Sequence, residues 1–90
     1  MWAADLDGTW IRYSNGLTFT AHNKHYEWRI PTRCRESGEL SGALEFSPAS
    51  GLAAPCFSPV FYSASVHWTD NGLEFEIDNQ SNLVDLEYQP

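Results

Sequence analysis

The chain lacks any lysine or arginine after Arg35. Its five basic residues all lie in residues 1–35, together with three acids, whereas residues 36–90 contain nine acids and no base. Like charges repel, so a segment of one sign destabilises a compact fold unless something else balances the cost. The sequence therefore favours a protein whose second half meets a positively charged partner.

The chain also lacks a long apolar segment. No run approaches the roughly 20 apolar residues that a membrane-spanning helix requires. The first ten residues, MWAADLDGTW, contain acids where a secretion signal has bases and an apolar run. The excess of acids disfavours anionic membranes and the nucleic acid backbone as direct partners. We expect a single β domain over 1–90, located in the cytoplasm, with no membrane or direct nucleic acid contact.

Cysteine is scarce, and the sequence shows few signs of catalytic or metal chemistry. Cys34 and Cys56 are expected to be free thiols in a cytosolic protein, although a single disulfide stays open. His22 and His25 are three residues apart and would face opposite sides of a straight strand. The chain contains no Cys-x-x-Cys, His-Glu-x-x-His or Gly-x-Ser-x-Gly motif. We therefore expect no enzyme, no cofactor and no metal site.

Apolar and polar residues alternate with a period of two through most of the chain. Leu17, Phe19 and Ala21 alternate with polar residues, and the later runs repeat this pattern. Such alternation predicts half-buried strands, whereas no window shows a convincing helical period. The predicted strands are 8–14, 17–23, 25–31, 39–46, 59–68, 73–78 and 83–88.

Turn residues separate these runs. Asn15-Gly16 and Asn71-Gly72 are strong signals for two-residue hairpins. Ser37-Gly38 and residues 78–82 supply further turns. The segment 47–59 contains three prolines and is expected to be a loop, in which residues 49–55 could form one turn of helix. Seven short strands joined in this way predict an all-β fold, a small antiparallel up-and-down meander that closes into a barrel or a two-layer sandwich.

Bulky aromatic residues occupy many positions predicted to face inward. A narrow barrel is filled by such side chains, which disfavours a ligand cavity, yet a binder of a small apolar ligand stays the main alternative. The inward aromatic residues are Trp10, Trp28, Phe46, Tyr62, Trp68, Phe75 and Tyr88.

Acidic residues gather on the predicted outer face of the last two strands. Residues two apart on a strand lie roughly 6.5–7 Å apart, close to the phosphate spacing of a nucleic acid strand, so the array would imitate that backbone. It would suit a target lined with lysine and arginine, and an exposed Phe57 or Phe61 would add an apolar anchor. The predicted partner-binding residues are Glu74, Glu76, Asp78, Asp85 and Glu87, extended by Glu39 and Glu45.

The basic segment 22–35 mixes arginines with aromatic residues, as proteins that bind single-stranded nucleic acid do. Tyr26 and Trp28 alternate inward, however, and the acidic remainder of the chain would repel a polyanion. We therefore expect Arg29, Arg33 and Arg35 to be solvated or paired with Glu36 and Glu39.

Residues 6–10, LDGTW, resemble the opening of the calycins, the barrel superfamily of lipocalins and avidins, in which Gly-x-Trp begins the first strand. In this chain the motif is Gly8-Thr9-Trp10. Residues 39–45, ELSGALE, resemble an avidin strand of the form Gly-x-Leu-x-Gly. The resemblance implies a meander barrel, from which this chain would lack one strand, and it assigns no ligand-binding residue.

These observations favour an acidic protein-binding inhibitor that masks a basic surface on another protein, one that handles nucleic acid. Anti-defence proteins (anti-CRISPR or anti-restriction) and toxin immunity proteins share this profile, since they are small, acidic and without catalytic motifs. The analogy is one of class, because function does not follow from a fold.

Overall fold

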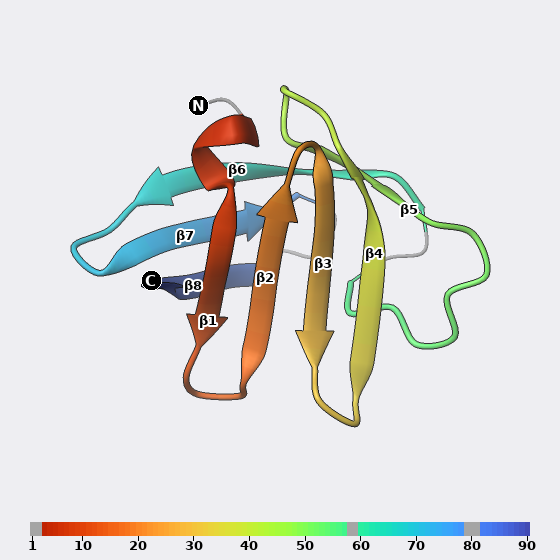
Figure 1. Cartoon of the computed structure of the whole chain (residues 1–90), viewed down its shortest axis with the longest axis horizontal. Helices are drawn as coiled ribbons and strands as arrows, with labels where there is room; N and C mark the ends of the chain where they lie inside the picture. Colours follow the sequence, from red (N-terminus) through yellow and green to blue (C-terminus); the bar gives the residue numbers. More distant parts are fainter. Residues whose placement is uncertain (1–2, 58–59, 79–81) are drawn as a thin grey trace.

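Eight antiparallel strands in chain order form a closed barrel, in which β8 pairs back onto β1 (Figure 1). The computed structural model describes residues 3–57, 60–78 and 82–90. A short 3₁₀ helix, Ala3–Leu6, comes before the barrel, and no helix of the described residues is long and apolar enough to cross a membrane. The strands are β1 (Gly8–Arg12), β2 (Leu17–His22), β3 (His25–Ile30), β4 (Cys34–Leu40), β5 (Glu45–Pro48), β6 (Tyr62–Trp68), β7 (Gly72–Ile77) and β8 (Asn82–Gln89).

The predicted all-β meander and its closure into a barrel are confirmed. Figure 1 shows β1 to β4 as one curved wall, with β6 to β8 crossing behind it. A hairpin forms at Asn15-Gly16, but it is not the expected two-residue turn, because Arg12 pairs with Leu17 and the loop spans residues 13–16. Gly16 has a positive φ, and its N–H donates to the Arg12 carbonyl at 2.9 Å. Strict alternation of apolar and polar residues in β2, β3 and β7 orients each strand, because one face of each is buried.

The prediction of seven strands was wrong by one, because the predicted strand 39–46 is two strands. β4 ends at Leu40 and β5 begins at Glu45, with a turn between them. Ser37-Gly38, predicted as a turn, lies inside β4. Gly38 is needed there for the close approach of β5, since an added Cβ would lie 2.1 Å from the Ser47 carbonyl oxygen. The barrel is therefore not one strand short of a calycin barrel.

Several predicted boundaries also differ. The predicted strand 8–14 ends at Arg12, and the strand predicted from residue 59 begins at Tyr62. Asn71-Gly72 is not the pair at the hairpin tip, because Gly72 begins β7 and its carbonyl accepts the Thr69 N–H at 2.9 Å. The loop predicted over 47–59 begins after Pro48, and no helix forms over 49–55. Two short parts of the predicted loops lie outside the described residues: 58–59 at the end of this loop, and 79–81 in the predicted turn 78–82.

Aromatic side chains fill the barrel interior. Phe19, Trp28, Phe46 and Phe75 are all fully buried, and Phe19 and Trp28 pack with ring centroids 4.4 Å apart. Such pairs contribute roughly 0.5–1.5 kcal/mol beyond the burial of their area. The filled interior leaves the outer surface as the place to look for binding.

Trp68 and Tyr88, predicted to face inward, are instead 58% and 49% exposed. Their positions in the alternation are inward, but both lie where the strands run past one end of the core. There they pack around Trp10, with ring centroids 6.0 and 5.0 Å from it. Trp10 itself is buried and donates from its indole N–H to the Leu6 carbonyl, which fixes the 3₁₀ helix against the barrel.

The loop after β5 is attached to β4 by four consecutive residues of that strand. Cys34 forms a disulfide with Cys56, which makes the expectation of free thiols wrong. The Arg35 N–H donates to the Ala54 carbonyl at 2.9 Å, and the Ala49 N–H donates to the Ser37 carbonyl at 2.8 Å. The Phe57 N–H donates to the Glu36 carboxylate at 3.1 Å. The loop is therefore a fixed wall of the barrel.

The disulfide should contribute substantially to stability. A cross-link between residues that are 22 positions apart is expected to stabilise the fold by about 3 kcal/mol, because it restricts the unfolded chain. Urea unfolding of the oxidised protein and of the C34S/C56S variant should show this difference in free energy. An unchanged unfolding midpoint in the variant would contradict a stabilising cross-link between the loop and β4 through Cys56.

Candidate binding surfaces

Four carboxylates gather on the outer face of β7 and β8, and we call Glu74, Glu76, Asp85 and Glu87 the acidic face. Glu74 and Asp85 are direct partners across the two strands. Glu76, Asp85 and Glu87 are exposed, and Glu74 is partly buried. Like charges placed directly opposite destabilise a sheet by roughly 0.2–1 kcal/mol per pair, so this arrangement costs stability in the isolated protein.

No acid of the acidic face forms a recorded ion pair within the part of the chain that the structure describes, although His67 on β6 is the cross-strand partner of Glu74. The ion pair recorded there joins Arg35 to Glu27, at the opposite wall of the barrel. A cleft of about 460 Å³ beside the face is lined by Arg12, Glu74, Asp85 and Glu87, but none of these carboxylates forms an ion pair with Arg12 among the described residues. The face therefore keeps its negative charge available to a partner.

The other predicted partner-binding acids lie progressively farther from this face. Asp78 follows β7 and accepts a hydrogen bond from the Ser63 hydroxyl. Glu45 is the partner of Ser63 on β5, so it lies across β6 from Asp78. Glu39 is on β4, opposite His25 and Ser47. The structure brings the four acids of β7 and β8 together and leaves Glu39 on the far wall.

Of the two aromatic residues predicted as an exposed anchor, one is exposed. Phe57 is partly buried, with its ring centroid 4.8 Å from that of Trp28, whereas Phe61 is 76% exposed. Trp68 and Tyr88, which the alternation assigned to the core, form an exposed rim at the ends of β6 and β8. The signal that was missed is that Trp68 and Tyr88 lie close to the ends of their strands. An inward-facing residue there extends past the end of the core and stays exposed.

A buried carboxylate inside the barrel was also missed. Glu36 is fully buried and accepts hydrogen bonds from the Tyr26 hydroxyl at 2.9 Å, the Tyr62 hydroxyl and the Phe57 N–H. Of the two expectations for the arginines of residues 29–35, the solvated one holds, since all three are exposed. The recorded ion pair joins Arg35 to Glu27 rather than to Glu36 or Glu39. A buried charge requires such partners, and here neutral donors surround it. The alternation would have shown Glu36 facing inward only if β4 had been recognised.

The Glu36 cluster shifts the pKa of both tyrosines upward. Burial is the largest cause for each, and the neighbouring Glu36 charge and hydrogen bond add to it, because a phenolate would be desolvated and repelled. Both hydroxyls consequently remain hydrogen-bond donors to Glu36 well above the ordinary tyrosine range. The cluster serves to hold the loop at Phe57 and leaves no open position for a substrate.

The two histidines were expected on opposite sides of a strand, but the structure makes them neighbours. Asn23 and Lys24 have positive φ and form the tip of a hairpin, so His22 and His25 pair directly across β2 and β3 on the outer face. Among the described residues, no group of three or more histidine, cysteine or acidic side chains is arranged to hold a metal ion.

The pKa shifts predict loss of stability in alkali. A tyrosine whose pKa rises on folding contributes its full stability below the unfolded value of 10.0 and loses it as the pH rises further. Stability should fall above pH 10 by up to about 1.4 kcal/mol per pH unit for each of Tyr26 and Tyr62. Urea unfolding at a series of alkaline pH values measures this slope. The Tyr26→Phe variant should show a shallower slope, and an equal slope would contradict the cluster.

The calycin resemblance rests on residues that now have a structural place. Gly8 begins β1, and a Cβ there would lie 3.0 Å from the Tyr88 ring, while Trp10 closes one end of the core. The eight antiparallel strands are compatible with that superfamily. In comparisons with known proteins, no family model, no curated protein and no solved structure matched the chain.

Proposed function

We propose that the chain is an acidic protein-binding inhibitor whose acidic face masks a basic surface of another protein, one that handles nucleic acid. The observation that carries this proposal is the direct opposition of Glu74 and Asp85 on β7 and β8, with no ion pair to either acid recorded among the described residues. A target rich in lysine and arginine would neutralise the face and relieve the repulsion.

The surroundings of the acidic face support a protein partner. Trp68 and Tyr88 are exposed near the ends of β6 and β8, where they pack around Trp10, and aromatic residues are enriched among those that carry interface energy. Carboxylates that alternate along a strand lie roughly 6.5–7 Å apart, which suits a surface shaped to hold successive phosphates. The net charge of −7 would also speed association with a basic target at low salt.

The profile fits anti-defence proteins (anti-CRISPR or anti-restriction) and immunity-type proteins as a class. In this proposal the protein acts by occupying a surface and carries out no catalytic step. Exposed Glu76, Asp85 and Glu87 would make the principal contacts, Glu74 would complete the face, and Asp78 and Glu45 would lie at its edge. Glu39 is too far around the barrel to join the same contact.

Membership of the calycins, with a small apolar ligand, is the alternative. The superfamily holds such ligands inside the barrel, but here Phe19, Trp28, Phe46 and Phe75 fill the interior. A cleft of about 300 Å³ at one end, lined in part by Leu17, Phe57 and Val84, is the place that such a ligand would use. The acidic face has no role in this alternative, so we favour the inhibitor.

A cytoplasmic location remains a prediction, and the disulfide bears on it. Disulfides persist mainly in oxidising compartments and are rare in the cytosol. The Cys34–Cys56 bond therefore favours one of two situations. Either the protein meets its partner outside the reducing cytosol, or the protein enters the cytosol with this disulfide already formed.

Reversal of charge on the acidic face tests the proposal. Immobilised wild-type protein and the D85K/E87K variant would be exposed to a lysate of the native host, at low and high salt. We expect the wild type to retain a basic protein at low salt and to release it at high salt. The variant should retain at least tenfold less of that protein at low salt. Added wild-type protein should then block binding of nucleic acid by the purified partner.

The matched control is the D7K/E39K variant, which changes the net charge equally but leaves the acidic face intact. It should retain the partner as the wild type does. Equal losses in both variants would show that net charge alone matters. Retention by D85K/E87K, or a partner whose nucleic acid binding is unaffected, would contradict the proposed function.

A further inference from the structure

A second charged surface lies on the opposite wall of the barrel. Two strands separate β3 and β4 from β7 and β8 in either direction around the closed sheet. The outer surface of β3 and β4 and the adjoining loop form a cleft of about 550 Å³. Three of the five basic residues of the chain, Arg29, Arg33 and Arg35, line this cleft, and no aspartate or glutamate is among its described lining residues.

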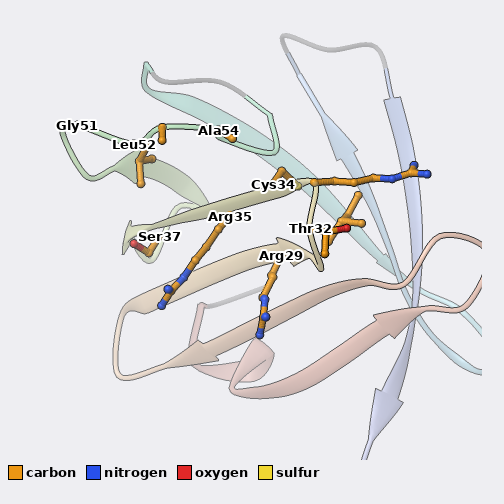
Figure 2. A pocket seen from close by; sticks show the side chains of 11 residues that line it. Arg29, Thr32, Cys34, Arg35, Ser37, Gly51, Leu52 and Ala54 are labelled. Carbon is orange, nitrogen blue, oxygen red and sulfur yellow. The ribbon is translucent and has the colours of Figure 1, made fainter.

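The arginines are positioned by the β3–β4 hairpin. Arg29 and Arg35 are direct partners across the two strands, so their like charges oppose each other. Figure 2 shows their side chains lying side by side over the two strands. Glu27 pairs with Arg35 at 2.8 Å, but no ion pair to Arg29 or Arg33 is recorded among the described residues. The cleft therefore has an excess of guanidinium donors.

The turn of this hairpin carries Arg33, the third arginine that lines the cleft. The Arg33 N–H donates to the Ile30 carbonyl at 3.0 Å, which closes a four-residue turn with Pro31 and Thr32 at its centre. Thr32 has a φ of 62°, the sign that the third position of a type II turn requires. The local backbone thus directs a third arginine to the same cleft.

The opposite side of the cleft is apolar and fixed. Leu52, Ala53 and Ala54 line it from the loop, and Ile30 lines it from β3. Figure 2 shows Leu52 and Ala54 on the loop beyond Ser37 and Cys34. The bonds from residues 34–37 to the loop, the disulfide included, hold this wall in place. A ligand would therefore meet a preformed site and lose little free energy in ordering it.

We propose that this cleft binds a small ligand in which a phosphate or sulfate group is attached to an apolar body. Guanidinium groups match the oxygens of such anions in pairs, and hydrogen bonds between charged groups are the stronger ones. The apolar body would cover Ile30 and the loop residues. The Ser37 and Thr32 hydroxyls are further polar groups at the site.

A single-stranded nucleic acid fits this cleft less well. Such strands bind where aromatic rings stack on successive bases, and no aromatic residue is among the described lining residues. Tyr26 and Trp28, the aromatic residues of β3, are buried in the core. The proposal is also independent of the acidic face, which lies on the other wall.

Titration of the ¹⁵N-labelled protein with phenyl phosphate tests this site. We expect saturable amide shifts confined to residues 29–37 and 51–54, with weaker binding as salt rises. Inorganic phosphate should bind at the same residues but several-fold more weakly, because it lacks the apolar body. The R29Q/R33Q variant should bind phenyl phosphate at least tenfold more weakly, since both arginines are exposed and their loss leaves the core intact.

The control is Lys24→Gln, which removes a base at the other end of β3 and should leave binding unchanged. Equal weakening in this control would show a general attraction of anions and overturn the site. Equal shifts with benzyl alcohol would show that the anion is irrelevant, and tighter binding of a short single-stranded oligonucleotide would overturn the choice of ligand. Absence of saturable shifts at about 10 mM phenyl phosphate would also overturn it, while the acidic-face proposal would stand.

Discussion

Closure of the sheet around an aromatic core is the constraint on which the rest of the molecule depends. Each residue of a strand must point either into the packed interior or out to solvent, because β1 pairs with β8 and no edge is left. Phe19, Trp28, Phe46 and Phe75 are fully buried in the interior, together with the other core residues. Charged side chains are therefore forced outward, where the order of strands decides which of them become neighbours.

The outcome is a barrel with charges of opposite sign on opposite walls. Acids alternate along β7 and β8, whereas arginines lie on β3 and β4, two strands away in either direction. Glu36 is the exception to outward charge. The Tyr26 and Tyr62 hydroxyls hold its carboxylate, which in turn accepts the Phe57 N–H and so attaches the loop beside the arginine cleft. The same loop carries Cys56. One buried acid and one disulfide thus hold the apolar wall of that cleft.

Much of the fold could be predicted because most strands alternate clearly. β2 has Leu17, Phe19 and Ala21 inward with polar residues between them, and β7 has Leu73, Phe75 and Ile77. β4 was missed because two of its inward residues are Glu36 and Gly38, which read as a polar turn. Glu36 needs hydrogen-bond donors from β3, β6 and the loop, and Gly38 is needed for the approach of β5. Neither requirement is visible in a local pattern.

The candidate binding surfaces, like the fold, could be predicted only where they depend on the alternation within single strands. The alternation of β7 and β8 predicts which acids share a face, but the assignment of Glu39 and Glu45 to the same surface depended on a strand that is in fact two. The arginine cleft could not be foreseen, since it needs the register of Arg29 with Arg35 and the path of the loop. Pairing of Cys34 with Cys56 likewise depends on that path.

Carbodiimide labelling of carboxylates, read by mass spectrometry with and without the bound partner, measures whether the partner covers the acidic face. We expect Glu76, Asp85 and Glu87 to be protected in the complex, while Asp7 and Glu39 are labelled as in the free protein. Protection of Asp7 or Glu39, with the three acids of β7 and β8 labelled equally in both states, would contradict this expectation.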